Sequence, residues 1–181
     1  MNDLKVTKLK WFWSWQDENQ EAWLEAMARG GLHLKDMKAF GRYVFEVGTP
    51  CAYAYRMDFD QSSGKDSEYF NLIRDAGWEH VMQVMGWQYW RKEASDGKPA
   101  ELFSDNASKI KKYKRFLVTL SGPIPALFII VLGMFKRFPG RHPEWVVITT
   151  ITVFMLYFAF LAVNLVKITQ RIRNLEQTSR L

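Results

Sequence analysis

The sequence has little of the residues that build crosslinked, fibrous or disordered chains. Its 181 residues include a single cysteine, Cys51, together with 11 glycines and 6 prolines. A single thiol excludes an internal disulfide framework, and the scarcity of glycine and proline excludes collagen-like and low-complexity chains. With 48% hydrophobic and 24% charged residues, the chain is long enough for one folded domain and an additional segment.

Residues that carry recognisable chemistry are also scarce. Three histidines occur, and neither they nor Cys51 stand at metal-site spacings such as C-x-x-C or H-E-x-x-H. Gly30 and Gly31 lack the rest of a phosphate-binding loop and stand where a helix would end. We therefore expect no metal, no cofactor and no catalytic residue, and we predict that the chain is not an enzyme.

Positive charge is concentrated in the C-terminal part of the sequence. Residues 1–108 contain 13 Lys+Arg against 17 Asp+Glu, whereas residues 109–181 contain 12 against 2. A domain that binds nucleic acid carries the basic excess on its own surface, and here the N-terminal part is mildly acidic. Nucleic acid is therefore not an expected partner.

Two long uncharged runs occur in this basic part, at residues 116–135 and 145–166. As helices, both are long enough to cross about 30 Å of hydrocarbon. The polar residues 136–144 separate them. The pattern predicts a hairpin of two transmembrane helices, and two buried core helices of a soluble protein are the alternative.

The charges beside these runs predict an orientation. Eight Lys and Arg residues flank the open end of the predicted hairpin, whereas three stand in the predicted loop at 136–144. The excess of cations on the cytoplasmic side of membrane proteins then places both termini, including the tail at 167–181, in the cytoplasm and the loop outside. We expect a multi-pass membrane protein.

The N-terminal part alternates between strand and helix patterns. A half-buried strand is predicted from the alternation of Leu9, Trp11, Trp13 and Trp15 with mostly polar residues. A helix follows up to Gly30, and residues 32–37 and 42–47 have the pattern of a hairpin. Residues 7–47 are therefore predicted to form a β-α-β-β unit.

The same pattern returns in residues 51–93, with a strand at 53–59 and a helix that ends at Gly77. With an offset of 46 residues, Met27 and Gly31 correspond to Ile73 and Gly77. We predict that residues 1–103 form an α+β domain with a duplicated β-α-β-β unit. A chance similarity of two helix-and-hairpin units is the alternative.

Several segments resemble one protein family. They are FWSWQDENQEAWLEAMARGGLHL, YAYRMDF, IRDAGWEHVMQVMGWQYWRK and, most specifically, ELFSDNASKIKKYKRF. Over residues 10–116 the chain resembles the domain of unknown function family 2812. The resemblance implies a location in the bacterial cell membrane and, since such proteins are often encoded beside PadR-like transcriptional repressors, a role in envelope stress regulation. It implies no catalytic residues.

Candidate ligand contacts are the charged pair Arg56 and Asp58 and some of the aromatic residues. Arg56 and Asp58 share one face of the strand at 53–59, where we expect a structural ion pair or a solvated face in preference to a ligand site. Most aromatic side chains are expected in the core. The alternative is a groove for a small apolar ligand or a partner helix. Its candidate residues are Trp11, Trp13, Tyr55, Arg56, Asp58, Trp87 and Tyr89.

Residues 104–115 are predicted to form a basic linker helix that begins near Asn106 and runs without a breaker into the first apolar run. Five cations of this segment are expected to contact anionic lipid, each contributing about 1 kcal/mol. They are Lys109, Lys111, Lys112, Lys114 and Arg115. The alternative is that these charges only set the orientation in the membrane.

These features predict a membrane-anchored cytoplasmic module with a regulatory or protein-interaction role. The expected partners are the anionic inner leaflet of the bilayer and an unidentified protein, with self-association as a further option. The alternative function is a sensor of small apolar ligands that uses the aromatic groove.

Overall fold

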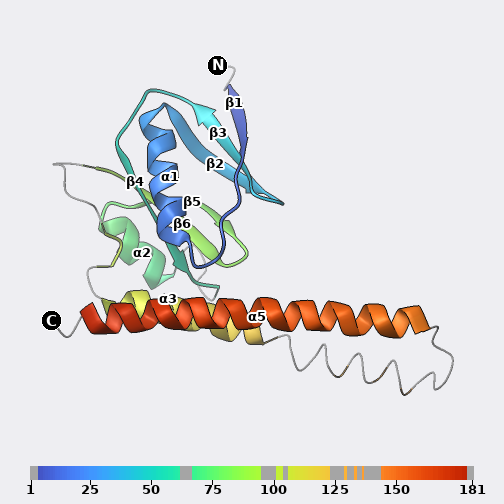
Figure 1. Cartoon of the computed structure of the whole chain (residues 1–181). Coiled ribbons are helices and arrows are strands. Elements are labelled where there is room, and N and C mark those ends of the chain that lie inside the picture. The colour runs from blue at the N-terminus through green and yellow to red at the C-terminus, as the bar shows by residue number, and fades with distance from the viewer. Residues whose placement is uncertain are drawn as a thin grey trace. The chain divides into compact units, whose positions relative to one another are not determined.

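The computed structural model describes residues 4–61, 67–94, 101–103, 106–122, 129, 133, 136 and 144–178 (Figure 1). The chain divides into two compact units, Met1–Lys112 and Tyr113–Leu181. We call them the α+β unit and the helical unit, because the first contains two small sheets with helices and the second is helical where it is described. The predicted α+β class is confirmed.

The first sheet has three antiparallel strands in the order β1–β3–β2. The strands are β1 (Lys5–Leu9), β2 (Leu32–Lys38) and β3 (Arg42–Val47), and helix α1 (Asp17–Arg29) precedes β2. After α1 the backbone adopts a φ of 78° at Gly31, where a Cβ atom would lie 2.6 Å from the carbonyl oxygen of Gly48. Only glycine fits this passage from helix to strand.

The second sheet has the same arrangement, in the order β4–β6–β5. Its strands are β4 (Tyr53–Phe59), β5 (Glu79–Val84) and β6 (Trp87–Glu93), and helix α2 (Glu68–Asp75) precedes β5. The hydroxyl of Ser67 caps α2 by accepting a hydrogen bond from the Phe70 amide at 3.4 Å. The element order is thus that of two successive β-α-β-β units.

The two units share their irregularities as well as their order. The register shifts once in each sheet, between Leu34 and Asp36 in β2 and between His80 and Met82 in β5. Each hairpin turn contains two successive residues with positive φ, as in type I′ turns. The register shifts follow the offset of 46 residues that the sequence indicated for the helix ends, and the turns follow an offset of 45.

The predicted strand through Trp11, Trp13 and Trp15 is wrong, because β1 ends at Leu9. The amide of Gln16 donates to the carbonyl oxygen of Trp13 at 2.8 Å, and the Gln16 side chain accepts from the Trp13 amide at 3.0 Å. The rings of Trp13 and Trp15 stack 5.3 Å apart with 2° between their planes. The alternation of bulky residues therefore arises from ring stacking along a turn.

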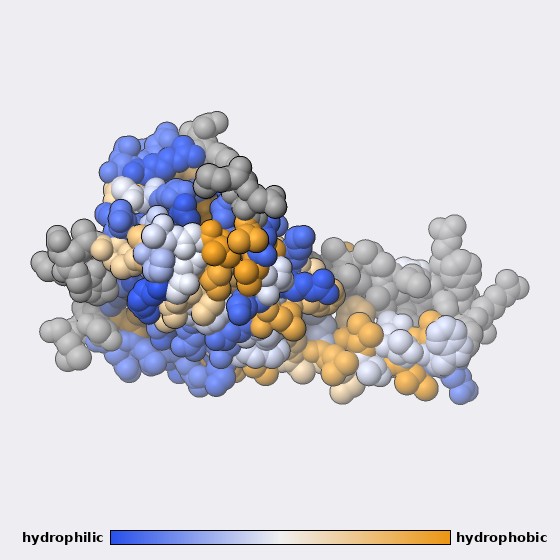
Figure 2. All heavy atoms as spheres, turned by 90° about the horizontal axis from the view of Figure 1, so that it is seen from above, coloured by the Kyte–Doolittle hydropathy of each residue, from blue (hydrophilic) through white to orange (hydrophobic). Residues whose placement is uncertain are grey.

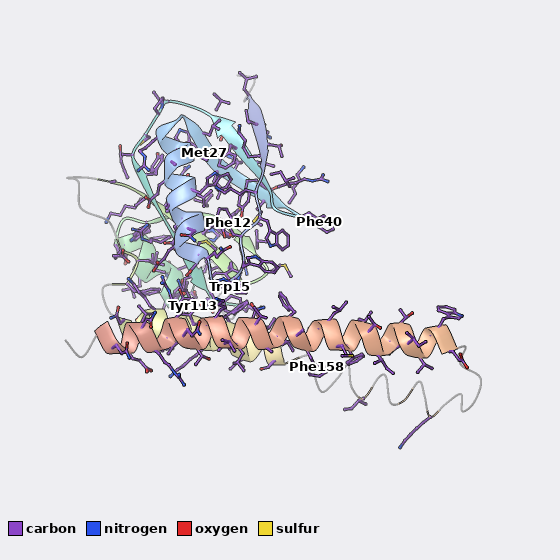
Figure 3. All side chains as sticks on the ribbon, viewed as in Figure 1. Phe12, Trp15, Met27, Phe40, Tyr113 and Phe158 are labelled. Atoms are coloured by element: carbon purple, nitrogen blue, oxygen red, sulfur yellow. The ribbon has the colours of Figure 1, made fainter. Side chains whose placement is uncertain are left out.

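Aromatic and aliphatic side chains fill the interior of the α+β unit. The main cluster consists of Leu24, Ala28, Leu34, Tyr43, Phe45, Tyr55, Met57, Met82 and Tyr89. A second cluster consists of Ala54, Phe70, Ile73, Trp78 and Trp90. Met27 of α1 and Phe12, both labelled in Figure 3, pack against the main cluster. Strand β4 contributes residues to both clusters, so it is covered on both faces.

Helix α3 (Asn106–Ser121) belongs to both units, because its first seven residues lie within the α+β unit and the rest within the helical unit. The α+β unit thus reaches Lys112 and includes the first residues of the predicted linker helix at 104–115. A helix that begins at Asn106 agrees with the linker predicted from the sequence.

Helix α5 (Glu144–Thr178) is long and apolar enough to cross a membrane, and no residue of its most apolar 18-residue stretch is buried. It contains the predicted second span at 145–166 and continues into the predicted tail. In Figure 2 hydrophobic residues recur along this helix, whereas hydrophilic residues dominate the visible face of the α+β unit. Most of the predicted first span at 116–135 and nearly all of the loop at 136–144 lie outside the described residues.

Candidate functional site

A buried ion pair joins the start of α3 to helix α1. The ammonium group of Lys112 lies 2.6 Å from a carboxylate oxygen of Asp17 and donates to the carbonyl oxygen of Met57 at 3.2 Å. The two side chains are 9% and 1% exposed. The ammonium group of Lys112 therefore joins α1, β4 and α3. Because both side chains are shielded from water, removing only one of them would be strongly destabilising.

A second carboxyl group, that of Glu21, lies one helical turn further along α1. One of its oxygens accepts a hydrogen bond from the Met57 amide at 2.8 Å. Burial raises the pKa of Glu21 to about 8, and although the charge of Lys112 lowers it, the charge of Asp17 raises it. Burial therefore favours the protonated form of Glu21, and the ion pair of Lys112 is made with Asp17.

Arg56 on β4 connects this pair to the outer part of the site. Its guanidinium donates to Glu25 at 2.7 Å and lies 3.9 Å from Glu21 and 3.5 Å from Glu101. Glu101 in turn pairs with Lys109 of α3 at 2.9 Å. Burial lowers the pKa of Arg56, but the hydrogen bond to Glu25 and the charges of Glu21 and Glu101 raise it above its ordinary value.

We call these seven residues the ionic cluster. They are Asp17, Glu21, Glu25, Arg56, Glu101, Lys109 and Lys112. Three come from α1, one from β4, one from the segment before α3 and two from the first turns of α3, and all seven lie within the α+β unit. With Asp17 and Lys112 closed off from solvent, the arrangement is suited to hold or release a helix.

The structure separates the predicted pair Arg56 and Asp58. Arg56 is part of the ionic cluster, where its nearest carboxylate is that of Glu25 on α1. Asp58 is completely buried and accepts a hydrogen bond from the Tyr69 hydroxyl at 2.7 Å. Burial and the negative charge of Asp58 raise the pKa of Tyr69. A solvated face is excluded for Asp58, because no part of its surface is exposed.

The aromatic residues of the predicted groove do not share one open surface. Tyr55 and Tyr89 are core residues, 1% and 4% exposed, and the Tyr89 hydroxyl accepts from Gln20 at 2.8 Å. Trp87 is half-buried against Phe59. The remaining two, Trp11 and Trp13, are exposed on the segment between β1 and α1.

The predicted lipid contact of Lys112 is wrong, because its side chain is buried in the ion pair with Asp17. Lys109 is half-buried and paired with Glu101. Lys111 and Lys114 are exposed, and Arg115 is half-buried. The other four cations of the predicted set stay candidates for contact with lipid.

Sequence reasoning missed the carboxyl groups of the ionic cluster. Asp17, Glu21 and Glu25 stand at intervals of four residues and so form one stripe along α1. On α3 the partners Lys109 and Lys112 are separated by three residues, which also places them on one face. Matching stripes of opposite charge on two predicted helices were the signal that could have indicated the contact.

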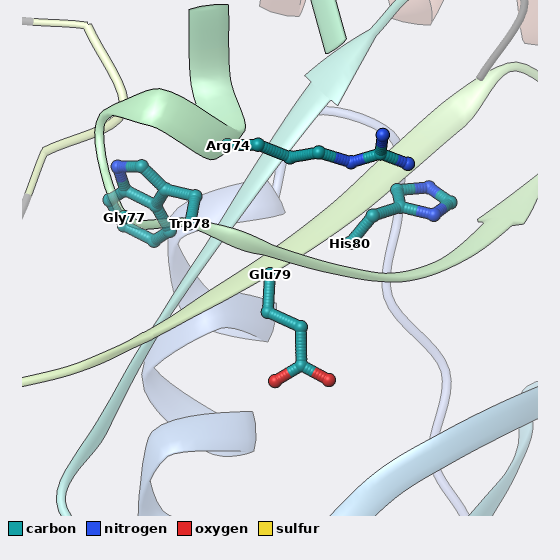
Figure 4. A pocket seen from close by; sticks show the side chains of 5 residues that line it. All are labelled: Arg74, Gly77, Trp78, Glu79 and His80. Atoms are coloured by element: carbon teal, nitrogen blue, oxygen red, sulfur yellow. The ribbon is translucent and has the colours of Figure 1, made fainter. Parts of the chain in front are cut away.

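A separate hollow of about 570 Å³ lies between the end of α2 and the start of β5, the edge strand of the second sheet. It is lined by Arg74, Gly77, Trp78, Glu79 and His80 (Figure 4). Figure 4 shows Arg74 and His80 on one side of β5 and Glu79 on the other. Glu79 is engaged by Arg91 through two hydrogen bonds of 2.8 Å. Among the described residues, no group of three or more His, Cys, Asp or Glu could hold a metal ion.

The fold and the ionic cluster define a class of protein: an α+β domain whose terminal helix is bound by buried charges, followed by a helix of membrane-spanning length. The model of the family described as "Protein of unknown function (DUF2812)" matches residues 16–122, and the chain belongs to this family. The match includes the whole ionic cluster. Searches of curated proteins and of solved structures gave no match.

Proposed function

We propose that the chain is a membrane-anchored regulatory module whose α+β unit binds a protein partner. In this proposal the start of α3 reports the bound state to the apolar helices. The observation that carries the proposal is that α3 begins inside the ionic cluster and continues as one helix into the apolar residues after Arg115. A helix bound by buried charges at one end and apolar at the other is suited to link a domain to an anchor.

The nature of the contact supports a switch between two states. Replacing a buried ion pair by apolar packing is often neutral or stabilising, whereas breaking the pair while its members stay buried costs several kcal/mol. In this proposal the start of α3 alternates between two states, one with Lys112 paired to Asp17, as in the structure, and one with both groups hydrated. Regulatory proteins use the binding of a partner to shift the equilibrium between two such states.

The test uses a photoreactive residue at Leu72, the large apolar side chain of α2 that is 68% exposed. The full chain is expressed in bacterial cells and illuminated. We expect one discrete adduct whose yield changes at least fivefold in Lys112→Met. The matched control is Lys111→Met, which removes the neighbouring exposed cation and should leave the yield unchanged. Equal yields in both variants would contradict a regulatory role for the start of α3.

We further propose that residues 116–135 and 145–166 form a hairpin of two spans with both termini in the cytoplasm. The support is the uncharged length of both runs and the excess of cations at their outer flanks. A reporter that is active only outside the cytoplasm should be inactive after Leu181 and active near Gly140. The reverse pattern would reject this orientation. A link to PadR-like repressors stays a prediction from the family resemblance.

We also infer that the two β-α-β-β units are copies of one ancestral unit. The shared strand order, the matching register shifts and the equivalent turns support this inference. The alternative function, a sensor with an aromatic groove, loses support because Tyr55, Asp58 and Tyr89 are buried in the interior.

A further inference from the structure

Four large apolar side chains are exposed at one end of the first sheet. Leu9, Trp11, Trp13 and Phe40, which we call the apolar tip, are 76%, 61%, 42% and 78% exposed. Phe40 lies at the end of the β2–β3 hairpin and points away from the sheet (Figure 3). A soluble surface rarely concentrates exposed apolar side chains in this way, and where it does they mark interaction sites.

Backbone contacts bring these residues together. Leu9 pairs with Arg42 in the register of β1 and β3, and the Lys10 amide donates to the Gly41 carbonyl oxygen at 2.9 Å. The segment that follows β1 therefore runs beside the hairpin turn. The ring of Trp11 meets that of Trp13 edge to face, with centroids 5.9 Å apart.

The turn itself holds Phe40 in an unfavourable conformation. Its φ is 61°, in the left-handed region that favours glycine and asparagine, and Gly41 follows with 68°. Since most of the Phe40 side chain is exposed, packing within the chain does not offset this strain. A bulky apolar residue held in this way points to a contact made outside the chain.

Positive charge is concentrated in the strands and segments that lead to the apolar tip. Residues 5–12 and 35–46 contain six cations and two carboxylates, whereas the rest of residues 1–108 contains seven cations and fifteen carboxylates. The six cations are Lys5, Lys8, Lys10, Lys35, Lys38 and Arg42. One of the two carboxylates, Glu46, is paired with Lys35 at 3.5 Å. Lys38 and Arg42 lie next to the tip, and the strands that lead to it form a basic region in a unit that is otherwise acidic.

We propose that the apolar tip and its cations dock the α+β unit on an anionic lipid surface. Tryptophan and phenylalanine at a protruding turn can enter the boundary between headgroups and acyl chains, while lysine and arginine pair with lipid phosphates. A bilayer is within reach because the same chain carries α5, so this inference rests on the proposed membrane anchoring. The docked face shares no residue with the ionic cluster or with the predicted lipid-contacting cations at 109–115.

The second hairpin provides a matched control. Met85 occupies the equivalent turn position with a φ of 49° and is 89% exposed. Residues 81–90 around it contain no charged side chain. Met85→Asn therefore removes a similar exposed apolar group from the same kind of turn without a basic surround.

The experiment measures how deeply the turn enters lipid. The full chain, with Cys51→Ser and a nitroxide label on Ala39→Cys, is reconstituted in phosphatidylcholine vesicles with or without about one third phosphatidylglycerol. Collision rates with oxygen and with a water-soluble nickel complex report depth. We expect the label to contact lipid only with phosphatidylglycerol and to return to water in about 1 M salt, where charges are screened beyond about 3 Å.

Variants separate the contributions of the two kinds of side chain. Phe40→Asn should lower the ratio of docked to undocked units by about tenfold or more. This factor corresponds to the free energy of transferring one phenylalanine side chain from water to an apolar phase, which the variant loses. Lys38→Gln and Arg42→Gln should each lower it about fivefold. Met85→Asn should leave the ratio unchanged. Asparagine is tolerated at positive φ, so Phe40→Asn keeps the fold.

A second label on Met155→Cys in α5 distinguishes failure of docking from failure of the anchor. If this label contacts lipid while the label at residue 39 stays in water in both vesicle types, docking is overturned and the anchor stands. If neither label contacts lipid, both proposals fail. If the label at residue 39 is shielded in detergent without lipid and more so at higher protein concentration, the tip binds a second copy and lipid docking is overturned.

Discussion

Replacing Lys112 by methionine tests how strongly the ionic cluster holds the start of α3. The Lys112 ammonium lies 2.6 Å from Asp17, whose side chain is 1% exposed, so the variant leaves a carboxylate buried without its partner. Removing one member of a buried pair costs about 3–5 kcal/mol. We expect the free energy of unfolding of the α+β unit to fall by that amount, measured on the full chain in detergent micelles by tryptophan fluorescence in urea.

Two further variants decide whether this loss comes from the ion pair. Lys111→Met removes an exposed neighbour on the same helix and should change stability by less than about 0.5 kcal/mol. The double variant Asp17→Asn with Lys112→Met should lose less than the sum of its single variants, with a coupling energy of about 2 kcal/mol. If Lys112→Met costs no more than Lys111→Met, or if the two single losses simply add, the ionic cluster does not hold the helix.

Three further predictions use other described residues. Because the pKa of Glu21 is about 8 in the folded chain against 4.5 ordinarily, the folded state binds its proton more tightly, and the free energy of unfolding should fall as pH rises from about 4.5 to about 8. Urea midpoints across this range should show Glu21→Gln flattening that fall, and an unchanged slope would show that Glu21 is not the group responsible. Gly31→Ala should cost more than Gly77→Ala in thermal unfolding, because a Cβ would lie 2.6 Å from a backbone oxygen at Gly31 but 3.4 Å from a flexible lysine side chain at Gly77. Phe40→Asn and Met85→Asn should each stabilise the chain by about 1 kcal/mol in urea titrations, since both relieve a strained φ, and a loss of stability would mean that these side chains pack.

The local elements of the α+β unit could be predicted because their signals are local. Alternating residues in β4, a glycine stop after α1 and a glycine in the first hairpin turn each act within a few residues. The segment through Trp13 and Trp15 was predicted wrongly for the same reason. Spacing by two residues is shared by a strand and by a turn whose rings stack, and only the tertiary surroundings distinguish the two cases.

The ionic cluster could not be predicted, because it depends on a contact across 95 residues. The stripe of Asp17, Glu21 and Glu25 is visible in the sequence, but an acidic stripe is also what a solvated helix face presents. Lys112 stands among four other cations ahead of an apolar run, a pattern that favours a lipid contact. The angular position of each of these five cations around α3, relative to β4, decides which one points into the interior.

The distance along the chain between Asp17 and Lys112 also sets an order of events during synthesis. At about 5–20 residues per second, the ribosome adds the 95 intervening residues in roughly 5 to 20 s. During that interval the ammonium group of Lys112 cannot yet join α1 to β4. The buried contacts of the α+β unit are therefore completed only once Lys112 has been made, shortly before the uncharged residues 116–135.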